Sequence, residues 1–469
     1  MAHHRAASLS LHAACNLSGG LLKDFVARRP WFARPDDGAI GSRQEQAQGS
    51  RPWLSTDKRA KGDDMELGYK DLDRLYERGA QKLEGLRRTA LAPDNEKPPI
   101  TLSQQEASQL VGVHPSTMAR KVADGTYPSG HLPGNKRRRR FRLDEVHQMM
   151  EIEGTRLHKP AGTPAKRITC ANFKGGVGKT TVCVSLAQYL CRAGSRVLVV
   201  DMDPQGSLTS LFGLLPDSDV EDERTILPKL ESDEGPHLRE IIRPTHWHDL
   251  DLIPASLSVF SAEYSIPARQ QEAGPGFPFY ELLSNALDEV ADDYDVILID
   301  SQPALGYLTT NAIYAADGLI IPLPPGMMDY ASCVSFLHLL QETLDVTQRH
   351  STRRAEGYDW LRFLITRHDR SVAHDTVTEW IRRTYQEYVI PSPIYTTSVV
   401  HSLGARMLTP YESQDAEAEQ KGRKRIDKRT LQRAYDILDD AYSEVGRLLR
   451  ESWGYVDPAD LSVSEAVSR

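Results

Sequence analysis

Residues 167–181 read Arg-Ile-Thr-Cys-Ala-Asn-Phe-Lys-Gly-Gly-Val-Gly-Lys-Thr-Thr, and this stretch indicates the fold more clearly than any other. A β-prone run ends at Asn172, a glycine-rich turn follows, and the next residues have the pattern of a helix. A strand, a glycine loop and a helix N-terminus together bind phosphate, because backbone N–H groups and the helix dipole attract anionic oxygens. We expect Lys179 to contact the β- and γ-phosphates of a nucleotide and the Thr180 hydroxyl to coordinate Mg²⁺.

The loop departs from the common P-loop pattern, Gly-x-x-x-x-Gly-Lys-Ser/Thr, at its first position. Phe173 occupies that position, and a second lysine, Lys174, opens the sequence Lys-Gly-Gly-Val-Gly-Lys-Thr. This deviant Walker A motif resembles that of the ParA, MinD and nitrogenase-iron-protein group of P-loop ATPases. The resemblance implies ATP and Mg²⁺ as cofactors and a homodimer in which Lys174 adds positive charge at the partner's nucleotide. The nucleotide-binding residues that it implies are Lys174, Gly175, Gly176, Val177, Gly178, Lys179, Thr180 and Thr181.

Acidic residues follow two further apolar runs. Residues 196–200 predict a buried strand that carries Asp201 and Asp203 at its carboxyl end. Residues 294–300 repeat the pattern and end in Asp300. Ligands of open parallel sheets bind at this edge, so we expect the three acids near the phosphates. Aspartates after a strand can instead cap a turn.

The family resemblance assigns roles to these acids. The segment with Asp203 resembles switch I, where this carboxylate orients the attacking water and acts in catalysis with Lys174 and Lys179. In the segment that resembles switch II, Gln302 replaces the first proline of the family pattern, which leaves the local geometry open. Arg367 follows another predicted strand and is expected to border the adenine. The metal ligands implied by the resemblance are Thr180, Asp201 and Asp300.

The composition limits the classes of protein to which this chain can belong. A chain of 469 residues exceeds one ordinary core, so two or three folded units are expected. Hydrophobic residues at 40% and charged residues at 26% describe a soluble globular protein. The net charge of −8 gives no overall attraction to nucleic acid, so DNA contacts must come from local basic patches. No apolar run is long enough for a membrane span, and five cysteines without a Cys-x-x-Cys pair favour reduced, buried thiols.

The N-terminal part precedes these motifs. Residues 1–64 lack sustained periodicity and are predicted to be a tail or an over-long start assignment. Residues 65–99 comprise a predicted amphipathic helix over 66–91 and a proline-containing linker. The leucines of this helix would pack either on the chain's own domain or on a second copy, and the pattern leaves both open. Residues 454–469 are predicted to be a C-terminal tail.

Residues 100–150 predict a winged helix-turn-helix. Ser103–Glu106 is a capping box, so a helix should start at about Gln104. A turn at Gly112–His114 separates it from a second helix over 116–124, and such a helix pair fits a DNA major groove. The side chains that would face the groove are Ser116, Thr117, Arg120 and Lys121.

A basic hairpin would complete this block. The run 133–142 contains Gly134 and Asn135, which suit a hairpin turn, and a cluster of arginines suited to phosphates. A solvated loop is the alternative for such a charge run. The block resembles the N-terminal domain of type Ia ParA proteins, and residues 151–165 would link it to the ATPase domain. The arginines expected to contact DNA are Arg137, Arg138, Arg139 and Arg140.

The motifs occur in the family order over residues 166–453, on alternating predicted strands and helices. The predicted fold class is therefore α/β, a mostly parallel sheet P-loop NTPase with an N-terminal winged helix-turn-helix domain. A nitrogenase-like reductase is excluded, because Cys333 is the only cysteine after Asp300. Acidic residues in the predicted last helix, 427–453, argue against a membrane anchor.

The resemblance implies a cytoplasmic, nucleoid-associated partition ATPase. ATP would close the homodimer, the dimer would bind DNA non-specifically, and a ParB-like centromere-binding protein would stimulate its weak hydrolysis. The basic cluster at 421–425 is a candidate for the non-specific contacts. The N-terminal domain would repress the protein's own operon. The alternative is a nucleotide-gated transcriptional repressor without a segregation role, which partner-stimulated hydrolysis would distinguish.

Overall fold

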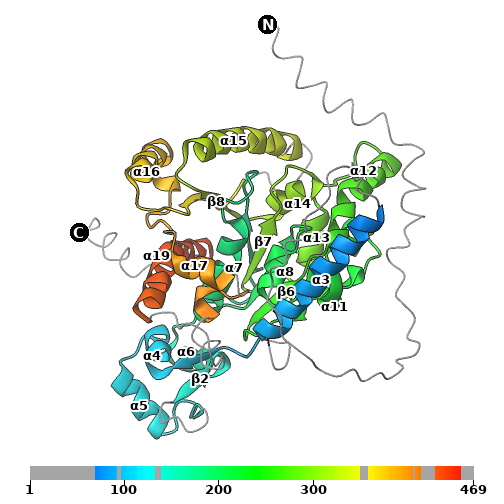
Figure 1. Ribbon diagram of the computed structural model, residues 1–469. Coiled ribbons are helices and arrows are strands. Elements are labelled where there is room, and N and C mark those ends of the chain that lie inside the picture. Colours follow the sequence, from blue (N-terminus) through cyan, green and yellow to red (C-terminus); the bar gives the residue numbers. More distant parts are fainter. Residues whose placement is uncertain are drawn as a thin grey trace, which may run out of the picture. The chain divides into compact units, whose positions relative to one another are not determined.

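The computed structural model is shown in Figure 1. The chain divides into two compact units, Met1–Tyr69 and Lys70–Arg469, and the account below concerns the second. Several predicted features lie outside the described residues: the tail 1–64, the tail 454–469 beyond residue 455, the basic cluster at 421–425, and the hairpin turn at 133–138 with Arg137 and Arg138. The structure describes residues 69–91, 97–132, 139–348, 357–404, 407–412 and 428–455.

A seven-stranded sheet forms the centre of the ATPase part, with the strand order β5-β6-β4-β7-β3-β8-β9. Every neighbouring pair is parallel except β5 and β6, which pair antiparallel. The mostly parallel sheet predicted from the sequence is confirmed. The strands are β3 (Lys166–Cys170), β4 (Val197–Met202), β5 (Arg243–Pro244), β6 (Leu250–Ile253), β7 (Val296–Ser301), β8 (Gly318–Leu323) and β9 (Trp360–Ile365).

Helices cover both faces of the sheet, because its central strands are apolar on both sides. Val197 and Val199 of β4 belong to the core shared with α7 (Lys179–Arg192) and α19 (Lys428–Ser452). Leu198 and Val200 point the other way, to α12 (Ala262–Ala273), α13 (Leu282–Asp288) and α14 (Tyr307–Ala315). On that second face, α15 (Met327–Gln348) and α16 (Val372–Tyr385) cover β8 and β9 (Figure 1).

Short helices fill the connections between these elements. They are α8 (Ser207–Leu211), α9 (Pro216–Asp219), η2 (Asp222–Arg224), α10 (Leu227–Glu231), α11 (Leu238–Ile241), η3 (Leu257–Ser261), η4 (Gln386–Tyr388), α17 (Ser398–Gly404) and η5 (Pro410–Glu412). None of the described helices combines the length and the apolar character that a membrane span would need.

Residues 101–153 form the small block β1 (Thr101–Ser103), α4 (Gln104–Val111), α5 (Pro115–Ala123), β2 (Arg140–Arg142) and α6 (Leu143–Glu153). The Ser103 hydroxyl accepts from the Glu106 N–H while the Glu106 carboxylate accepts from the Ser103 N–H, as a capping box requires. Gly112 ends α4 with φ 77°, a left-handed conformation that glycine adopts at little cost. β1 pairs antiparallel with β2.

This block packs directly onto the ATPase part. Phe141 and Met150 belong to one continuous hydrophobic core with Leu190 of α7 and Tyr442 of α19. The connecting segment contributes as well, since Leu157 is buried in the same core. The block and the ATPase part therefore share one core.

Helix α3 (Tyr69–Leu91) has a different environment. Its apolar residues Leu72, Leu75, Tyr76 and Leu83 are between 45% and 62% exposed. A row of large apolar side chains exposed to water is unfavourable, since burying each would contribute about 1.5–3 kcal/mol. The described leucines of α3 are thus not packed on the chain's own domain.

Candidate nucleotide-binding site

The glycine loop places the start of α7 at the carboxyl edge of the sheet. Gly176 and Gly178 have φ values of +75° and +100°, a region that side chains with a Cβ rarely adopt. Gly178 is the N-cap of α7, so Lys179 is the first residue of the helix. The free N–H groups of this helix end face the loop, as phosphate binding requires.

Side chains from neighbouring strands fix the loop. The Asn172 carboxamide accepts from the Lys174 N–H at 3.0 Å and donates to the Pro322 carbonyl at 2.9 Å. The Thr366 hydroxyl, just after β9, donates to the Val177 carbonyl at 2.8 Å. The loop is therefore held to the ends of β8 and β9 without any ligand, which reduces the ordering that binding would cost.

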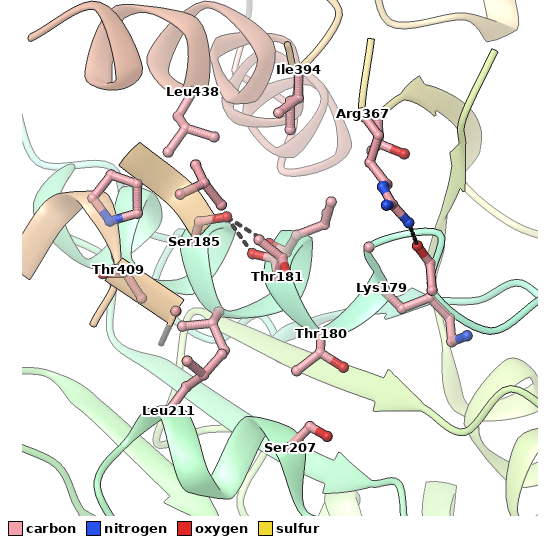
Figure 2. Close-up of a pocket in the computed structure, with 18 of the residues that line it drawn as sticks. Lys179, Thr180, Thr181, Ser185, Ser207, Leu211, Arg367, Ile394, Thr409 and Leu438 are labelled. Carbon is pink, nitrogen blue, oxygen red and sulfur yellow. Dashed lines mark hydrogen bonds between the residues drawn. The ribbon is translucent and has the colours of Figure 1, made fainter. Parts of the chain in front are cut away.

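A cavity of about 850 Å³ opens beside this loop. Figure 2 shows Lys179 and Arg367 toward one end of it and Leu211, Thr409 and Leu438 toward the other. Besides the loop and α7, the lining includes Asp203 and a C-terminal wall. The residues of that wall include Ile394, Tyr395, Thr396, Thr397, Val400, Met407, Leu408, Thr409 and Pro410. A cavity with a phosphate cradle at one end and apolar side chains beyond it suits a nucleotide.

Lys179 is only 6% exposed, and its ammonium group donates to the Lys174 carbonyl at 3.3 Å. Burial lowers the pKa of Lys179, while the carboxylates of Asp300 and Asp203 act in the opposite direction. A buried cation beside a phosphate cradle gains more from an anionic ligand than an exposed one does. Lys179 thus has the position that phosphate binding needs.

Asp300 ends β7 with both carboxylate oxygens buried, and neither has a hydrogen-bond partner of good geometry among the described residues. Burial and the charge of Asp201 raise the pKa of Asp300 well above its ordinary value, while the Thr180 hydroxyl and Lys179 oppose the rise. Buried carboxylates without partners are costly and are typical of metal-coordinating positions. Oxygen donors of this kind are the ligands that Mg²⁺ prefers, so Asp300 and Thr180 fit this ion.

Asp201 lies opposite Asp300 in the β4–β7 register, but its oxygens are already engaged. One oxygen accepts from the Asp203 N–H at 3.1 Å, and the other accepts from the N–H and the hydroxyl of Thr209 at 2.9 and 2.7 Å. Burial raises the pKa of Asp201 to about 7. The carboxylate thus anchors the switch I turn and α8, which is the capping role open to an aspartate after a strand. Its predicted role as a metal ligand stays a prediction.

Asp203 and Arg367 both reach the cavity. The Asp203 carboxylate accepts from the Gln205 N–H at 3.0 Å, which keeps it at the start of the switch I turn. Arg367, with φ 55°, donates to the Gly176 carbonyl and thereby bridges the glycine loop and the segment after β9. Arg367 lies at the same end of the cavity as Lys179 (Figure 2), and the roles predicted for Asp203 and Arg367 stay predictions.

The Lys174 side chain points away from this cavity and is not part of its lining. Its ammonium group forms a 2.8 Å ion pair with Asp329 near the start of α15. Asp329 was not recognisable from the sequence, because the two residues are far apart in the chain and belong to different motifs.

Comparisons with known proteins agree with this geometry. A family model described as an AAA domain matches residues 165–352. The "Putative replication protein A" of Rhizobium rhizogenes is 31% identical over 77% of this chain and 90% of its own length. Protein SopA of Escherichia coli K12 is 33% identical over 66% of this chain and 79% of its own. This chain belongs to the ParA-type partition ATPases.

The sporulation initiation inhibitor protein Soj of Bacillus subtilis is another relative of this ParA-type chain, 38% identical over 39% of this chain and 67% of its own length. Among solved structures, one described as "Partition Protein" superposes with a TM-score of 0.51 at 21% identity, and covers 72% of this chain and 95% of its own. At this identity the superposition concerns the fold alone.

Hydrogen bonds to Glu263 hold the switch II segment of this ParA-type chain. Gln302, where the family has proline, donates from its amide to the Glu263 carboxylate of α12 at 2.7 Å. The same carboxylate accepts from the N–H groups of Tyr307 and Leu308 at the start of α14. A Cβ at Gly306 would lie 2.4 Å from the Glu263 oxygens, so this approach requires glycine. Gln302 is thus tied through Glu263 to the start of α14 by hydrogen bonds.

The residues predicted to contact DNA lie partly on α5. Ser116 and Arg120 are exposed, and Thr117 is half-buried. The Lys121 ammonium group is paired with Glu153 at the end of α6. Arg120 therefore remains the better placed of the two basic residues of α5 for a base or phosphate contact.

Of the predicted basic hairpin at 133–142, the structure describes only residues 139–142. Arg140 of β2 donates from Nε to the Thr101 hydroxyl at 2.7 Å and also donates to the Thr101 carbonyl. Its guanidinium therefore holds β2 against β1, a role that the charge pattern did not predict. Arg139 is half-buried, and Arg137 and Arg138 lie outside the described residues.

Proposed function

We propose that this chain is a partition ATPase that binds ATP with Mg²⁺ and hydrolyses it slowly. Lys179 and the glycine loop bind the phosphates, Thr180 and Asp300 hold the metal ion, and Asp203 orients the attacking water. The buried, unpartnered Asp300 carboxylate beside the glycine loop carries this proposal. The metal ion supplies Lewis-acid stabilisation of the phosphates, and the apolar wall of the cavity excludes water.

We propose that the active form is a homodimer. Two observations support it: the exposed apolar face of α3, which a second copy would bury, and the orientation of Lys174 away from its own cavity. In the dimer Lys174 leaves Asp329 and contacts the partner's nucleotide, where it supplies charge to the transition state. The Lys174–Asp329 ion pair competes with that step within one chain.

Replacing Asp329 with asparagine is therefore expected to raise basal ATP turnover by about fivefold. The ion pair is only partly exposed, so we take the upper end for such pairs, about 1 kcal/mol, which corresponds to a factor of about five. In the variant this amount no longer opposes the movement of Lys174. Turnover should be measured at several protein concentrations, because the increase depends on dimer formation. Asp359→Asn, which breaks the pair between Asp359 and Lys166 on β3, is the matched control and should leave turnover unchanged. Turnover in Asp329→Asn equal to wild type would contradict the proposed competition.

We propose that residues 101–153 form a winged helix-turn-helix that binds an operator and represses the chain's own operon. The capped helix pair α4–α5, the antiparallel pair β1–β2 and the exposed Arg120 support it. Non-specific DNA binding by the ATP-bound dimer would place the protein on the nucleoid, where a ParB-like partner stimulates hydrolysis.

Replacing Arg120 with alanine is expected to weaken operator binding by about 1–3 kcal/mol if its guanidinium reads a base edge. Electrophoretic mobility shifts with operator and with scrambled DNA at fixed salt would measure the loss on each. A loss confined to the operator supports base readout. An equal loss of affinity for both DNAs would indicate that Arg120 contacts a phosphate. Unchanged affinity for both would mean that α5 does not contact DNA.

ATP turnover by the purified full-length chain tests the partition role directly. It should be measured alone, with non-specific DNA, and with the product of the adjacent downstream gene added. Weak basal turnover that rises with both additions supports the partition motor. Nucleotide binding without turnover under any of these conditions would favour the nucleotide-gated repressor, which Arg120 and the helix pair would also serve.

A further inference from the structure

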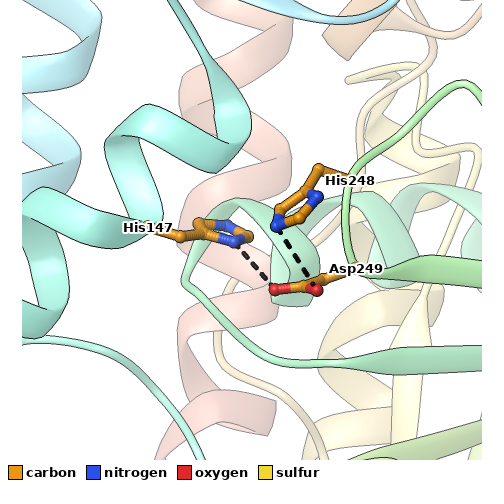
Figure 3. A group of neighbouring side chains, drawn as sticks. All are labelled: His147, His248 and Asp249. Carbon is orange, nitrogen blue, oxygen red and sulfur yellow. Dashed lines mark hydrogen bonds and ion pairs between the residues drawn. The ribbon is translucent and has the colours of Figure 1, made fainter. Parts of the chain in front are cut away.

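Three side chains far from the nucleotide cavity converge at the contact between the 101–153 block and the ATPase part (Figure 3). His147 comes from α6, and His248 and Asp249 come from the turn that leads into β6. One donor atom from each lies within 4.8 Å of the other two. We propose that these residues bind a transition-metal dication, best fitted by Zn²⁺, which joins the block to the ATPase part.

The orientation of His147 is the first argument. This ring is buried, and its Nε2 lies 2.8 Å from the Cys191 carbonyl, which can only accept, so Nε2 carries a hydrogen. In the neutral ring, Nδ1 then presents a lone pair to an Asp249 oxygen at 3.0 Å. Two acceptors at this distance repel each other unless a cation lies between them or on one of them. Arg156 donates to this same oxygen at 2.8 Å and supplies part of the positive charge, and a proton or a metal ion at His147 Nδ1 would supply the rest.

The third donor favours a metal ion over a proton. His248 Nε2 lies 3.5 Å from the other Asp249 oxygen. Zinc bonds of about 2.0–2.2 Å place neighbouring donors of a tetrahedral shell roughly 3.3 Å apart. The two observed spacings, each to a different oxygen of Asp249, lie on either side of that value, so both oxygens would face the ion. A proton shared by His147 and Asp249 would leave His248 with only an ion pair to the same carboxylate, whereas a metal ion would engage all three donors.

The surroundings hold the donors in place. The hydrogen bond from His147 Nε2–H to the Cys191 carbonyl is the outer contact that metal-bound histidines make. Arg156 donates to the Asp249 carboxylate at 2.8 Å, and the backbone of Asp249 has φ 62°. The guanidinium binds Oδ2, the oxygen that also faces His147, and this oxygen keeps a second lone pair for the ion. His248 is about half exposed, which gives the ion an entry path and a water as fourth ligand.

The donor set selects the class of ion. Two imidazoles and one carboxylate suit Zn²⁺, Co²⁺ or Ni²⁺, whereas Mg²⁺ prefers oxygen ligands and six-fold coordination. The ion would tie α6 to the turn before β6, because His248 and Asp249 come from that turn. It would thus cross-link the 101–153 block to the ATPase part, and the hydrogen bond from His147 to the Cys191 carbonyl adds a contact to the end of α7.

Metal binding by the full-length chain tests this site. The protein is stripped with a chelator, placed in buffer with excess Mg²⁺ to occupy oxygen sites, and titrated with CoCl₂ and then with ZnCl₂ by calorimetry. We expect one Co²⁺ per chain with the visible absorption of a tetrahedral site, and its displacement by Zn²⁺. In His248→Ala the Zn²⁺ affinity should fall more than about 100-fold, because loss of a direct ligand exceeds the effect of an outer partner.

Two further variants keep the result interpretable. His338→Ala removes an exposed histidine on α15 and should bind Zn²⁺ as the wild type does. Asp249→Asn keeps a residue that tolerates positive φ while it removes the carboxylate charge, and it should lose affinity while the chain stays folded. The proposal is overturned if the wild type takes up no Co²⁺ or Zn²⁺ in excess Mg²⁺. It is equally overturned if His248→Ala and Asp249→Asn both bind as tightly as the wild type.

Discussion

ATP binding by the full-length chain is expected to be lost when Lys179 is replaced with alanine. The Lys179 ammonium group would form charge-assisted hydrogen bonds to two phosphates, worth about 1.5–3 kcal/mol each. Removing both lowers affinity by roughly 100-fold or more, since each 1.4 kcal/mol is a factor of ten. Calorimetric titration with ATP and Mg²⁺ would measure the change.

The fold of this variant should be intact. Burial already lowers the pKa of Lys179, so the folded chain without nucleotide gains little from this ammonium group, and its melting temperature should not fall. Lys174→Ala is the matched control, because Lys174 pairs with Asp329 and should lose turnover while ATP binding is kept. Unchanged ATP affinity in Lys179→Ala would contradict the assignment of the glycine loop as a P-loop.

A second large effect is expected from Glu412→Gln, on stability rather than on binding. Glu412 is 3% exposed, and its carboxylate accepts from Lys97 at 2.9 Å and from His246 Nε2 at 2.7 Å. It also accepts from the Thr409 N–H at 2.9 Å. Removing one partner of a buried ion pair leaves the other charge uncompensated, which costs about 3–5 kcal/mol. Urea denaturation at pH 7 should show this loss in the free energy of unfolding.

The pH dependence gives this prediction a second readout. Burial raises the pKa of Glu412, but the charges of Lys97 and His246 outweigh it and hold the pKa at about 2, below the ordinary 4.5. A lowered carboxyl pKa stabilises the folded state above the unfolded value, and that contribution is lost as the pH falls through 4.5 toward 2. The difference between wild type and Glu412→Gln should therefore narrow over that range.

Glu379→Gln is the matched control for Glu412. Glu379 forms an exposed ion pair with Arg383 one turn along α16, and such pairs contribute about 0.3–0.5 kcal/mol. Its free energy of unfolding should therefore stay close to that of the wild type at every pH. A loss below about 1 kcal/mol in Glu412→Gln would mean that Lys97 is not held as a buried charge.

Local sequence patterns were sufficient for the elements that carry the site. The apolar runs of β4 and β7 place acids at the carboxyl edge of a parallel sheet, and the glycine loop places Lys179 at a helix start. The capping box located the start of α4 at Gln104. These features depend on residues within a few positions of one another, because periodicity, capping and glycine conformation are local properties.

Contacts between distant segments could not be predicted in this way. Periodicity and spacing describe residues that are neighbours along the chain, and they do not show which loops the fold brings together. Asp201 accepts hydrogen bonds from Thr209, and Lys174 forms an ion pair with Asp329. Glu412 meets Lys97 across 315 positions of sequence. The sequence by its own chemistry thus specifies a P-loop on a parallel sheet with acids beside it. The folded arrangement specifies which of those acids is left without a partner, which lysine is buried, and which distant segment closes the cavity.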